Sequence, residues 1–339
     1  MRVLLIKMSS MGDVFHTFPA LSDAMQAIPG ITFDWVVEKA FAEIPKWHPA
    51  VDKVYPIELR RWRKNLFRNE TRQQINAFFQ DLNQTSYDLI LDAQGLYKSV
   101  WVGRRIQGPV SGFDLKSARE PLASLFYRYK YPVAKSQHAI LRLRQLFAQA
   151  LKYEFLSNTP ICYGLQTESW CRPSVVPWQN EAYLVCLHGT TWETKYWPEE
   201  NWNRLLEKAA HLGLKVILPW GNNEERLRSL RLQDELKSDS IWVPEKMLTL
   251  NEMAAVLKNA KAVVSVDTGL SHVAAALDVP LLVLYRVTDP QLVGADGAKV
   301  TRLVSPLASQ YLKKFSGDQE RLSLQNIGVQ EVEEWLQHV

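Results

Sequence analysis

The sequence predicts an α/β protein made of two doubly wound parallel sheets, and three observations support this fold class. The chain has 339 residues, more than one hydrophobic core usually serves, so we expect two domains. Near the start, the apolar run Val3 to Ile6 leads through a Ser-Ser-Met-Gly turn into apolar residues at helical spacing. The same strand–turn–helix order begins again at Tyr183. A buried strand that feeds a turn and then a helix is typical of parallel α/β units.

In the first half of the chain, strands and helices are expected to alternate. After the first strand, apolar residues at helical spacing run from Asp13 through Phe18 and Leu21 to Met25. Further strands are expected at 33–37 and 87–91; further helices are expected at 70–82, after Gln94-Gly95 through Val100 and Ile106, and at 137–151. Together these elements form the predicted first domain, residues 1–165.

The second half is expected to repeat this order after a linker. Residues 157–181 are rich in proline and small polar residues without periodicity, and we interpret 166–181 as the linker. In the second domain, 182–325, strands are expected at 183–187, 215–218, 262–266 and 280–285, and helices at Pro198, after the cap Thr249, and after Asp267-Thr268-Gly269. Within residues 326–339, the stretch 329–336 is expected to form a helix that could pack on the N-terminal domain.

Composition excludes several classes of protein. The net charge is only +4, which does not by itself call for a polyanionic partner. The three cysteines, Cys162, Cys171 and Cys186, form no CxxC pair, so we expect reduced thiols rather than disulfides or a zinc site. The apolar run at the N-terminus is too short for a signal peptide, and no segment approaches the length of a membrane span. We therefore expect a cytoplasmic protein.

Three loops after predicted strands of the second half carry small polar residues. Ligands of doubly wound sheets bind outside the carboxyl ends of the strands. Helix N-termini with hydroxyls and a lysine favour a pyrophosphate, and a carboxylate one loop away favours a ribose. The alternative is that these side chains only cap helices, which explains many such residues taken singly. The residues concerned are Thr190, Thr191 and Lys195, then Gly221, Glu224 and Glu225, and then Asp267, Thr268, Gly269 and His272.

Neither GxxxxGK[ST] nor GxGxxG occurs in the sequence. These two motifs bind the phosphates in P-loop enzymes and in dinucleotide-dependent dehydrogenases. Their absence disfavours P-loop hydrolysis and standard dinucleotide redox chemistry, although phosphate groups can still be bound by the strand-end loops.

Asp13 is the candidate catalytic residue of the first half. It follows the first predicted strand, where a carboxylate can take a proton from an attacking hydroxyl. However, Ser10 and Asp13 also have the spacing of a capping box, and the spacing alone favours that role.

A run of basic residues suggests the second ligand. Arg60, Arg61, Arg63 and Lys64 place four cations within five residues around Trp62. Such a run is often a solvated face or a nucleic-acid patch, but no nucleic-acid-binding module is present. A small acceptor with several negative charges fits better, because guanidinium groups bind carboxylates and phosphates in pairs of hydrogen bonds. Further possible anion contacts in this half are Lys7, Lys98, Arg119 and His138.

Eight motifs resemble the lipopolysaccharide heptosyltransferase I family, whose members use ADP-heptose. The resemblance extends from the first residue to about Pro290. The long motif at 118–127 and the motif at 265–272 are the most specific. The motifs are KMSSMGD at 7–13, RRWRK at 60–64, DAQGL at 92–96, AREPLASLFY at 118–127, HGTT at 188–191, KYWP at 195–198, LPWG at 218–221 and SVDTGLSH at 265–272.

This resemblance implies a GT-B glycosyltransferase with two Rossmann-like domains that face each other across a cleft. It implies an inverting, metal-independent transfer of L-glycero-D-manno-heptose from ADP-heptose to the Kdo of Kdo-lipid A, in inner-core lipopolysaccharide synthesis. No cofactor and no nucleic acid are expected. Peripheral contact with the cytoplasmic face of the inner membrane is expected, because the acceptor carries a lipid.

The resemblance also assigns roles to residues of this sequence. Asp13 and Lys195 would be catalytic. The donor-binding set would be Thr190, Thr191, Lys195, Glu224, Met247, Asp267, Thr268, Gly269 and His272, with Glu225 as the alternative to Glu224. The acceptor-binding set would be Lys7, Ser10, Arg60, Arg61, Arg63, Lys64, Lys98, Arg119 and His138.

One segment departs from the family pattern. Where the family usually has Tyr-Gly-Pro-Thr-Asp-Pro, this chain has Tyr285-Arg286-Val287-Thr288-Asp289-Pro290. We expect Arg286 to add a bulky cation near the donor site and to change donor preference or loop closure. The alternatives are a related transferase such as heptosyltransferase II, another nucleotide-sugar transferase or, more remotely, a non-catalytic nucleic-acid-binding protein.

Overall fold

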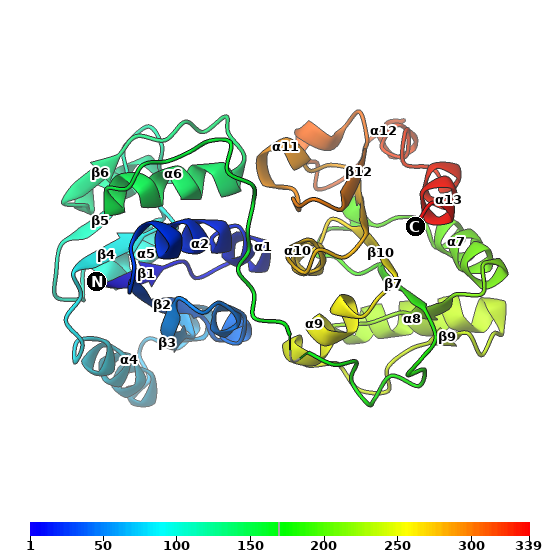
Figure 1. Cartoon of the computed structure of the whole chain (residues 1–339), viewed down its shortest axis with the longest axis horizontal. Helices are drawn as coiled ribbons and strands as arrows, with labels where there is room; N and C mark the ends of the chain where they lie inside the picture. The colour runs from blue at the N-terminus through cyan, green and yellow to red at the C-terminus, as the bar shows by residue number, and fades with distance from the viewer. Residues whose placement is uncertain (169) are drawn as a thin grey trace. The chain divides into compact units, whose positions relative to one another are not determined.

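The computed structural model describes residues 1–168 and 170–339, which form two compact units, Met1–Gln166 and Thr167–Val339 (Figure 1). Each unit contains one six-stranded sheet in which every pair of neighbouring strands is parallel. In both sheets the third, second, first, fourth, fifth and sixth strands of the unit lie side by side in that order. This is the strand order of a dinucleotide-binding fold. The predicted fold class is confirmed.

The first sheet has the order β3-β2-β1-β4-β5-β6. Its centre is fully apolar: Val3, Leu4, Leu5 and Ile6 of β1 have no exposed surface. Such a run is typical of a strand covered on both faces by helices. The strands are β1 (Arg2–Ile6), β2 (Thr32–Glu38), β3 (Val51–Ile57), β4 (Leu89–Asp92), β5 (Val110–Phe113) and β6 (Tyr129–Tyr131).

Helices cover the two faces of this sheet. Leu4 and Ile6 pack with Phe79 of α4 and Val100 of α5 on one side, whereas α2 and α6 pack against each other. The helices are α1 (Met11–Phe15), α2 (Phe18–Ala27), α3 (Leu59–Lys64), α4 (Asn69–Leu82), α5 (Tyr97–Gly103) and α6 (Ala139–Leu151), and a 3-10 helix, η3, spans Pro121–Phe126.

The apolar stretch from Asp13 to Met25 is two helices rather than the single one predicted. α1 ends at Phe15, and α2 begins at Phe18 with Pro19 in its first turn. A proline cannot donate a backbone hydrogen bond, and its ring clashes with the carbonyl four residues earlier, so a continuous helix is not possible. The short α1 therefore stands alone and carries Asp13.

The second sheet has the order β12-β11-β10-β7-β8-β9. Its strands are β7 (Tyr183–Leu187), β8 (Lys215–Ile217), β9 (Ile241–Trp242), β10 (Ala262–Val266), β11 (Leu281–Tyr285) and β12 (Val300–Val304). The helices of this unit are α7 (Glu199–His211), α8 (Asn223–Leu236), α9 (Leu250–Lys258), α10 (Gly269–Ala276), α11 (Pro290–Val293), α12 (Gln319–Leu322) and α13 (Val329–Gln337). The predicted capping box at Thr249 and Glu252 is present at the start of α9.

The C-terminal helix α13 packs on the second domain, so the expectation that it could pack on the N-terminal domain is corrected. Val329, Val332 and Leu336 are buried in the same apolar cluster as Trp202 and Leu205 of α7. These three residues lie on one face at helical spacing, and that face matches the apolar stripe of α7. None of the helices within 1–168 and 170–339 combines the length and the apolar composition needed to span a bilayer.

Candidate active site

Two loops of the first domain meet where the strand order reverses. β1 lies between β2 and β4, so the loops that follow β1 and β4 leave the same edge of the sheet side by side. The first loop contains Lys7 and Ser10 and leads to Asp13, whereas the second contains Gln94 and leads to Lys98. Ligands of doubly wound sheets bind at such a reversal.

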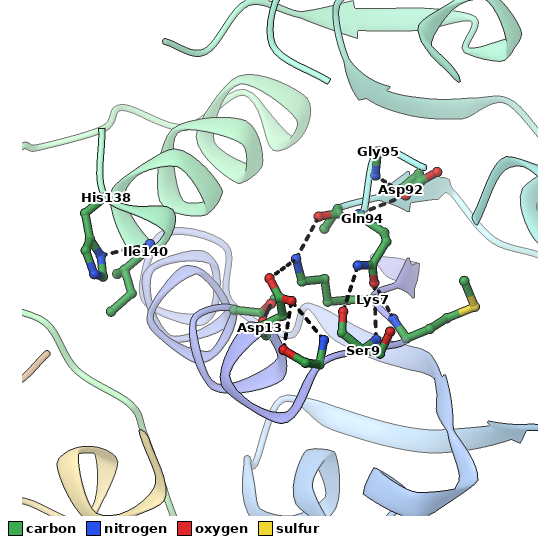
Figure 2. A network of polar contacts seen from close by, with 12 residues as sticks. Lys7, Ser9, Asp13, Asp92, Gln94, Gly95, His138 and Ile140 are labelled. Atoms are coloured by element: carbon green, nitrogen blue, oxygen red, sulfur yellow. Dashed lines mark hydrogen bonds and ion pairs between the residues drawn. The ribbon is translucent and has the colours of Figure 1, made fainter. Parts of the chain in front are cut away.

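Asp13 is a carboxylate held by groups of its own domain (Figure 2). Lys7 Nζ lies 3.2 Å from Asp13 Oδ1, and the Ser10 backbone N–H donates to Oδ2 at 2.8 Å. The Asp13 side chain keeps 26% of its surface exposed, whereas that of Lys7 keeps 7%. The carboxylate thus belongs to a capping box of α1 and is also accessible to a ligand. The two interpretations of Asp13 are compatible.

Neighbouring positive charge keeps Asp13 ionised. Burial alone would raise the pKa of this carboxyl, but the charges of Lys7 and His16 and the Ser10 N–H outweigh burial. Together they hold the pKa of Asp13 below its ordinary value. The group is therefore deprotonated at neutral pH, as a proton acceptor must be.

The Gln94 side chain joins the two loops. Its Oε1 accepts hydrogen bonds from the N–H groups of Met8 at 2.8 Å and Ser9 at 3.2 Å. Its Nε2 donates to the Ser9 carbonyl at 2.7 Å, and its own N–H donates to Asp92 at 2.9 Å. One buried amide therefore fixes the loop that leads to Asp13.

Three of the predicted acceptor-binding cations share one electrostatic environment. Burial lowers the pKa of Lys98, and the positive charges of Arg60 and Arg119 lower it further. The negative charges of Glu38 and Asp13 act in the opposite direction. Because charges are screened over about 10 Å in salt solution, this coupling indicates a positive cluster beside Asp13. Such a cluster favours an anionic ligand.

The other cations of the basic run differ in how far they are already engaged. Arg61 is paired with Glu58 at 2.6 Å and donates to Gln74 Oε1 at 2.6 Å, so its guanidinium already has partners. Arg63 and Lys64 are exposed near the end of α3. Arg60 is among the charges that act most strongly on Lys98.

His138 serves as the N-cap of α6, where its Nδ1 accepts a hydrogen bond from the Ile140 N–H at 3.3 Å (Figure 2). Its ring also lies 5.4 Å from the ring of His16 in an edge-to-face arrangement. Since His16 is one of the charges that act on Asp13, His138 belongs to the surroundings of the site.

The second domain contains a matching cluster at its own strand reversal. The loops after β7 and β10 carry Thr190, Lys195 and Asp267. Lys195 Nζ lies 2.6 Å from Asp267 Oδ2, and Thr190 Oγ1 donates to the Asp267 carbonyl at 2.9 Å. Capping alone therefore does not explain Thr190 and Asp267, because their polar atoms join two loops.

Five other predicted donor residues either lie at or within the start of α10 or are exposed. Thr268 precedes α10, and within the described part of the chain its side chain makes no capping hydrogen bond. The first N–H groups of α10, beginning at Gly269, are thus left for a ligand or water. His272 is buried within α10, whereas Thr191 and Met247 are exposed.

Glu225, rather than Glu224, lies against the strand-end loops. The Gly221 N–H donates to Glu225 Oε2 at 2.7 Å. A Cβ at Gly189 would lie 2.4 Å from the Glu225 carboxylate carbon, so a glycine is needed there for the carboxylate to approach the loop. Glu224 is exposed in the first turn of α8. Of the two glutamates, Glu225 is therefore the one whose carboxylate contacts these loops.

Arg286 is a bulky cation next to the loop that carries Lys195, and its charge is buried inside the domain. The side chain is 4% exposed, and its guanidinium donates to the Ser323 hydroxyl and to the Tyr196 carbonyl. A buried guanidinium with these partners is part of the interior of the domain, next to the loop that carries Lys195.

Solved structures define the class of the protein. The chain is similar to E. coli heptosyltransferase WaaC with ADP, with a TM-score of 0.89 and 43% identity over 100% of this chain and 99% of that one. The same enzyme with ADP-2-deoxy-2-fluoro heptose gives a TM-score of 0.85 and 41% identity over the same shares of both chains. The two doubly wound sheets are those of a GT-B glycosyltransferase.

Sequence comparisons then give the family. The profile of glycosyltransferase family 9 (heptosyltransferase) matches residues 75–320. Lipopolysaccharide heptosyltransferase 1 of Pseudomonas aeruginosa is 53% identical over 90% of this chain and 84% of its own length. The chain belongs to glycosyltransferase family 9, the heptosyltransferase family.

Several supporting residues were not found from the sequence. Gln94 and Tyr196 lie within the motifs at 92–96 and 195–198, but these motifs give them no role, and none of the eight motifs includes His16. The Tyr196 hydroxyl donates to the Thr190 carbonyl at 2.9 Å and so supports the donor loop. The positions of Gln94 and His16 near Asp13 depend on loops from different strands or on helix packing, and the one-dimensional pattern gives no signal for them.

Proposed function

We propose that this protein transfers L-glycero-D-manno-heptose from ADP-heptose to the Kdo of Kdo-lipid A, in the inner core of lipopolysaccharide. Membership of the heptosyltransferase family over nearly the whole chain carries this proposal. The donor is supported by the solved relative, which holds ADP-2-deoxy-2-fluoro heptose. The two polar clusters supply a mechanism.

Asp13 acts as the general base. The hydroxyl oxygen of the acceptor attacks the anomeric carbon of the heptose and forms the new C–O bond with inversion. The bond from that carbon to the diphosphate oxygen breaks, ADP leaves, and the hydroxyl proton moves to Asp13. When an anionic acceptor binds near Lys98 and Arg60, it offsets part of the positive field. The pKa of Asp13 then rises, and the carboxylate becomes a stronger base.

Lys195 stabilises the leaving group. Asp267 orients the Lys195 ammonium through their 2.6 Å contact. The backbone N–H groups at the start of α10, beginning at Gly269, follow Asp267 in the chain after Thr268. A fixed cation and backbone dipoles stabilise negative charge as it develops on ADP. We propose that this arrangement supports transfer without a metal. Glu225, held against Gly189, is the proposed ligand of the ribose hydroxyls.

Turnover with defined substrates tests this proposal. Purified protein is incubated with ADP-heptose and Kdo-lipid A, and the heptosylated lipid and released ADP are quantified in buffer containing EDTA. Equal amounts of both products support the proposal. Turnover only with a heptosylated acceptor would favour the second-heptose transferase instead, and salt-sensitive oligonucleotide binding without turnover would favour the nucleic-acid alternative.

We further propose that the protein works at the cytoplasmic face of the inner membrane, through a surface of the first domain that we name the η3 surface. It consists of Leu122, Leu125 and Phe126 of η3 with Arg104 and Arg128. The three apolar side chains are 53%, 61% and 44% exposed. The Arg104 guanidinium lies 5.0 Å from the Phe126 ring. Exposed apolar side chains among arginines suit anionic headgroups above acyl chains.

We propose that helix α5 connects the η3 surface to the acceptor site. Phe126 and Arg104 of this surface line a groove of about 610 Å³, together with Tyr97, Val100, Trp101 and Arg105. At the start of α5, Lys98 Nζ donates to the Ser9 hydroxyl at 2.8 Å in the loop that leads to Asp13. A lipid-bearing acceptor could therefore meet the base while its lipid stays near the membrane.

Vesicle binding tests this surface. Leu125→Glu is compared with Leu227→Glu, since Leu227 is a 49% exposed leucine of α8 in the second domain. We expect Leu125→Glu to weaken binding to phosphatidylcholine vesicles containing about a third phosphatidylglycerol by about tenfold or more, because a leucine inserted into lipid contributes about 1.5–3 kcal/mol. Equal binding by both variants would refute this surface.

A further inference from the structure

Arg286 is a buried cation at the end of β11, where the family resemblance predicts glycine. Its Nε donates to the Ser323 hydroxyl at 3.0 Å, and its Nη2 donates to the Glu320 carbonyl at 3.4 Å. The guanidinium carbon lies 4.8 Å from the centre of the Phe315 ring. One side of the guanidinium is therefore occupied by a single stretch of chain, residues 311–323, which we call the C-terminal segment.

The other side of the guanidinium contacts the donor loop. Arg286 Nη1 donates to the Tyr196 carbonyl, one residue after Lys195. The Tyr196 hydroxyl in turn donates to the Thr190 carbonyl at 2.9 Å, and the Thr190 hydroxyl donates to the Asp267 carbonyl at 2.9 Å. A continuous series of hydrogen bonds thus leads from Arg286 to the carboxylate-bearing residue that pairs with Lys195.

Other contacts join the same two stretches of chain. The Thr194 hydroxyl donates to the Leu312 carbonyl at 2.7 Å. Two ammonium groups lie near the Trp192 ring, with Lys195 Nζ 4.8 Å and Lys313 Nζ 5.6 Å from its centre. The loop that carries Lys195 therefore contacts the C-terminal segment directly through Trp192 and Thr194, and indirectly through Arg286 at Tyr196.

Most of the acceptors of Arg286 are neutral. Burial lowers its pKa to about 10, so the side chain is still charged at neutral pH. A buried charge without a direct carboxylate partner is costly unless its donors are all used, so each lost acceptor should disturb its neighbours. Movement of the C-terminal segment would thus be transmitted to the Tyr196 carbonyl and to Lys195.

We propose that Arg286 is a positioning residue that fastens the Lys195 loop to the C-terminal segment and thereby sets the affinity for the ADP part of the donor. This inference rests on the proposed function, because it takes Lys195 as the ligand of the diphosphate. It makes the C-terminal segment, which lies outside the sheet, part of the donor-binding scaffold.

The test compares Arg286→Ala with Arg286→Lys and with a matched control, Arg302→Ala. Arg302 is a partly buried arginine of the neighbouring strand β12, but its hydrogen bonds go to Ala295 and its ion pair to Asp296. ADP affinity is measured by calorimetry, KM for each substrate and kcat by product formation, and Tm by circular dichroism.

We expect Arg286→Ala to raise the Kd for ADP and the donor KM by about tenfold, with the acceptor KM unchanged. Arg286→Lys should recover part of the loss, because an ammonium can still reach one or two of the acceptors. Ser323→Ala should weaken ADP binding in the same direction and add little to Arg286→Ala, since both changes break one connection.

Three results decide between the possibilities. Unchanged ADP affinity in a folded Arg286→Ala protein would overturn the positioning role. Equal loss of ADP affinity in Arg302→Ala would show a general effect of destabilising the domain, which also overturns it. Absence of ADP binding by the wild-type protein would refute the proposed function itself. This outcome is distinguishable from failure of the Arg286 proposal, because it is measured without any variant.

Discussion

Replacement of Asp13 by asparagine removes the proton acceptor and keeps most of the local structure. The asparagine carbonyl can still accept the hydrogen bond that the Ser10 N–H now gives to Asp13 Oδ2 at 2.8 Å, so the cap of α1 is retained. We expect turnover to fall by about 100- to 10,000-fold, the usual contribution of a general base. ADP affinity should stay the same, since Lys195 and its partners belong to the other compact unit.

The Asp13→Asn change should also lower the free energy of unfolding, and the burial of Lys7 and Asp13 sets the size of this loss. Lys7 is almost fully buried and loses its charged partner. Removal of one partner from a fully buried ion pair costs about 3–5 kcal/mol, and the partial exposure of Asp13 reduces this to about 1–2 kcal/mol. For a unit of this size, about 1 kcal/mol shifts Tm by about 2–4 °C. The variant should therefore remain folded at assay temperature.

The assay measures initial rates with ADP-heptose and Kdo-lipid A, ADP binding by calorimetry, and Tm by circular dichroism. The double variant Lys7→Met with Asp13→Asn serves as a control, because it removes the unpaired ammonium. It should recover stability without recovering activity. Turnover close to wild type by folded Asp13→Asn protein would refute the assignment of the base, and a parallel loss of ADP affinity would contradict the separation of the two clusters.

Three further predictions concern substitutions at the two candidate sites. Lys7→Met removes a charge that lowers the pKa of the base; that pKa rises, so the acid limb of the kcat/KM profile should move to higher pH, and an unmoved limb would argue against this coupling. Glu225→Ala should weaken ADP binding about tenfold while Glu224→Ala does not, as calorimetry can check; the reverse order would restore the original choice. Arg60→Ala should raise the acceptor KM about fivefold and Arg61→Ala less, since Arg61 is already paired with a carboxylate; a weakened donor affinity in either would contradict the acceptor role.

Much of the fold could be predicted from local patterns. The apolar runs at 3–6, 183–187 and 262–266 are strands buried on both faces, and such strands carry an unambiguous signal. The cap at Thr249 was equally clear. Five strands were not predicted. β3, β6, β9 and β12 lie at the edges of the two sheets, and β5 has only four residues. Short or edge strands depend on the neighbours that pair with them, so their local pattern is weak.

The candidate sites were only partly predictable. The motifs, together with the expectation that ligands bind at the carboxyl ends of the strands, selected Asp13, Lys195 and Asp267. These residues lie in or after loops at the points where the strand order of each sheet reverses. The motifs did not separate Glu224 from Glu225, since adjacent residues on a helix point in different directions and only the position of Gly189 decides which carboxylate reaches the loop.

Periodicity and short motifs were enough to predict the class of fold, the family and the residue types available for proton transfer and phosphate binding. The tertiary structure decided which of these groups have partners. Asp13 is held ionised by Lys7, and Arg286 is buried against a segment far along the chain rather than facing a ligand. Charge and burial are properties of neighbours in space, and folding chooses those neighbours from residues that are distant in the chain.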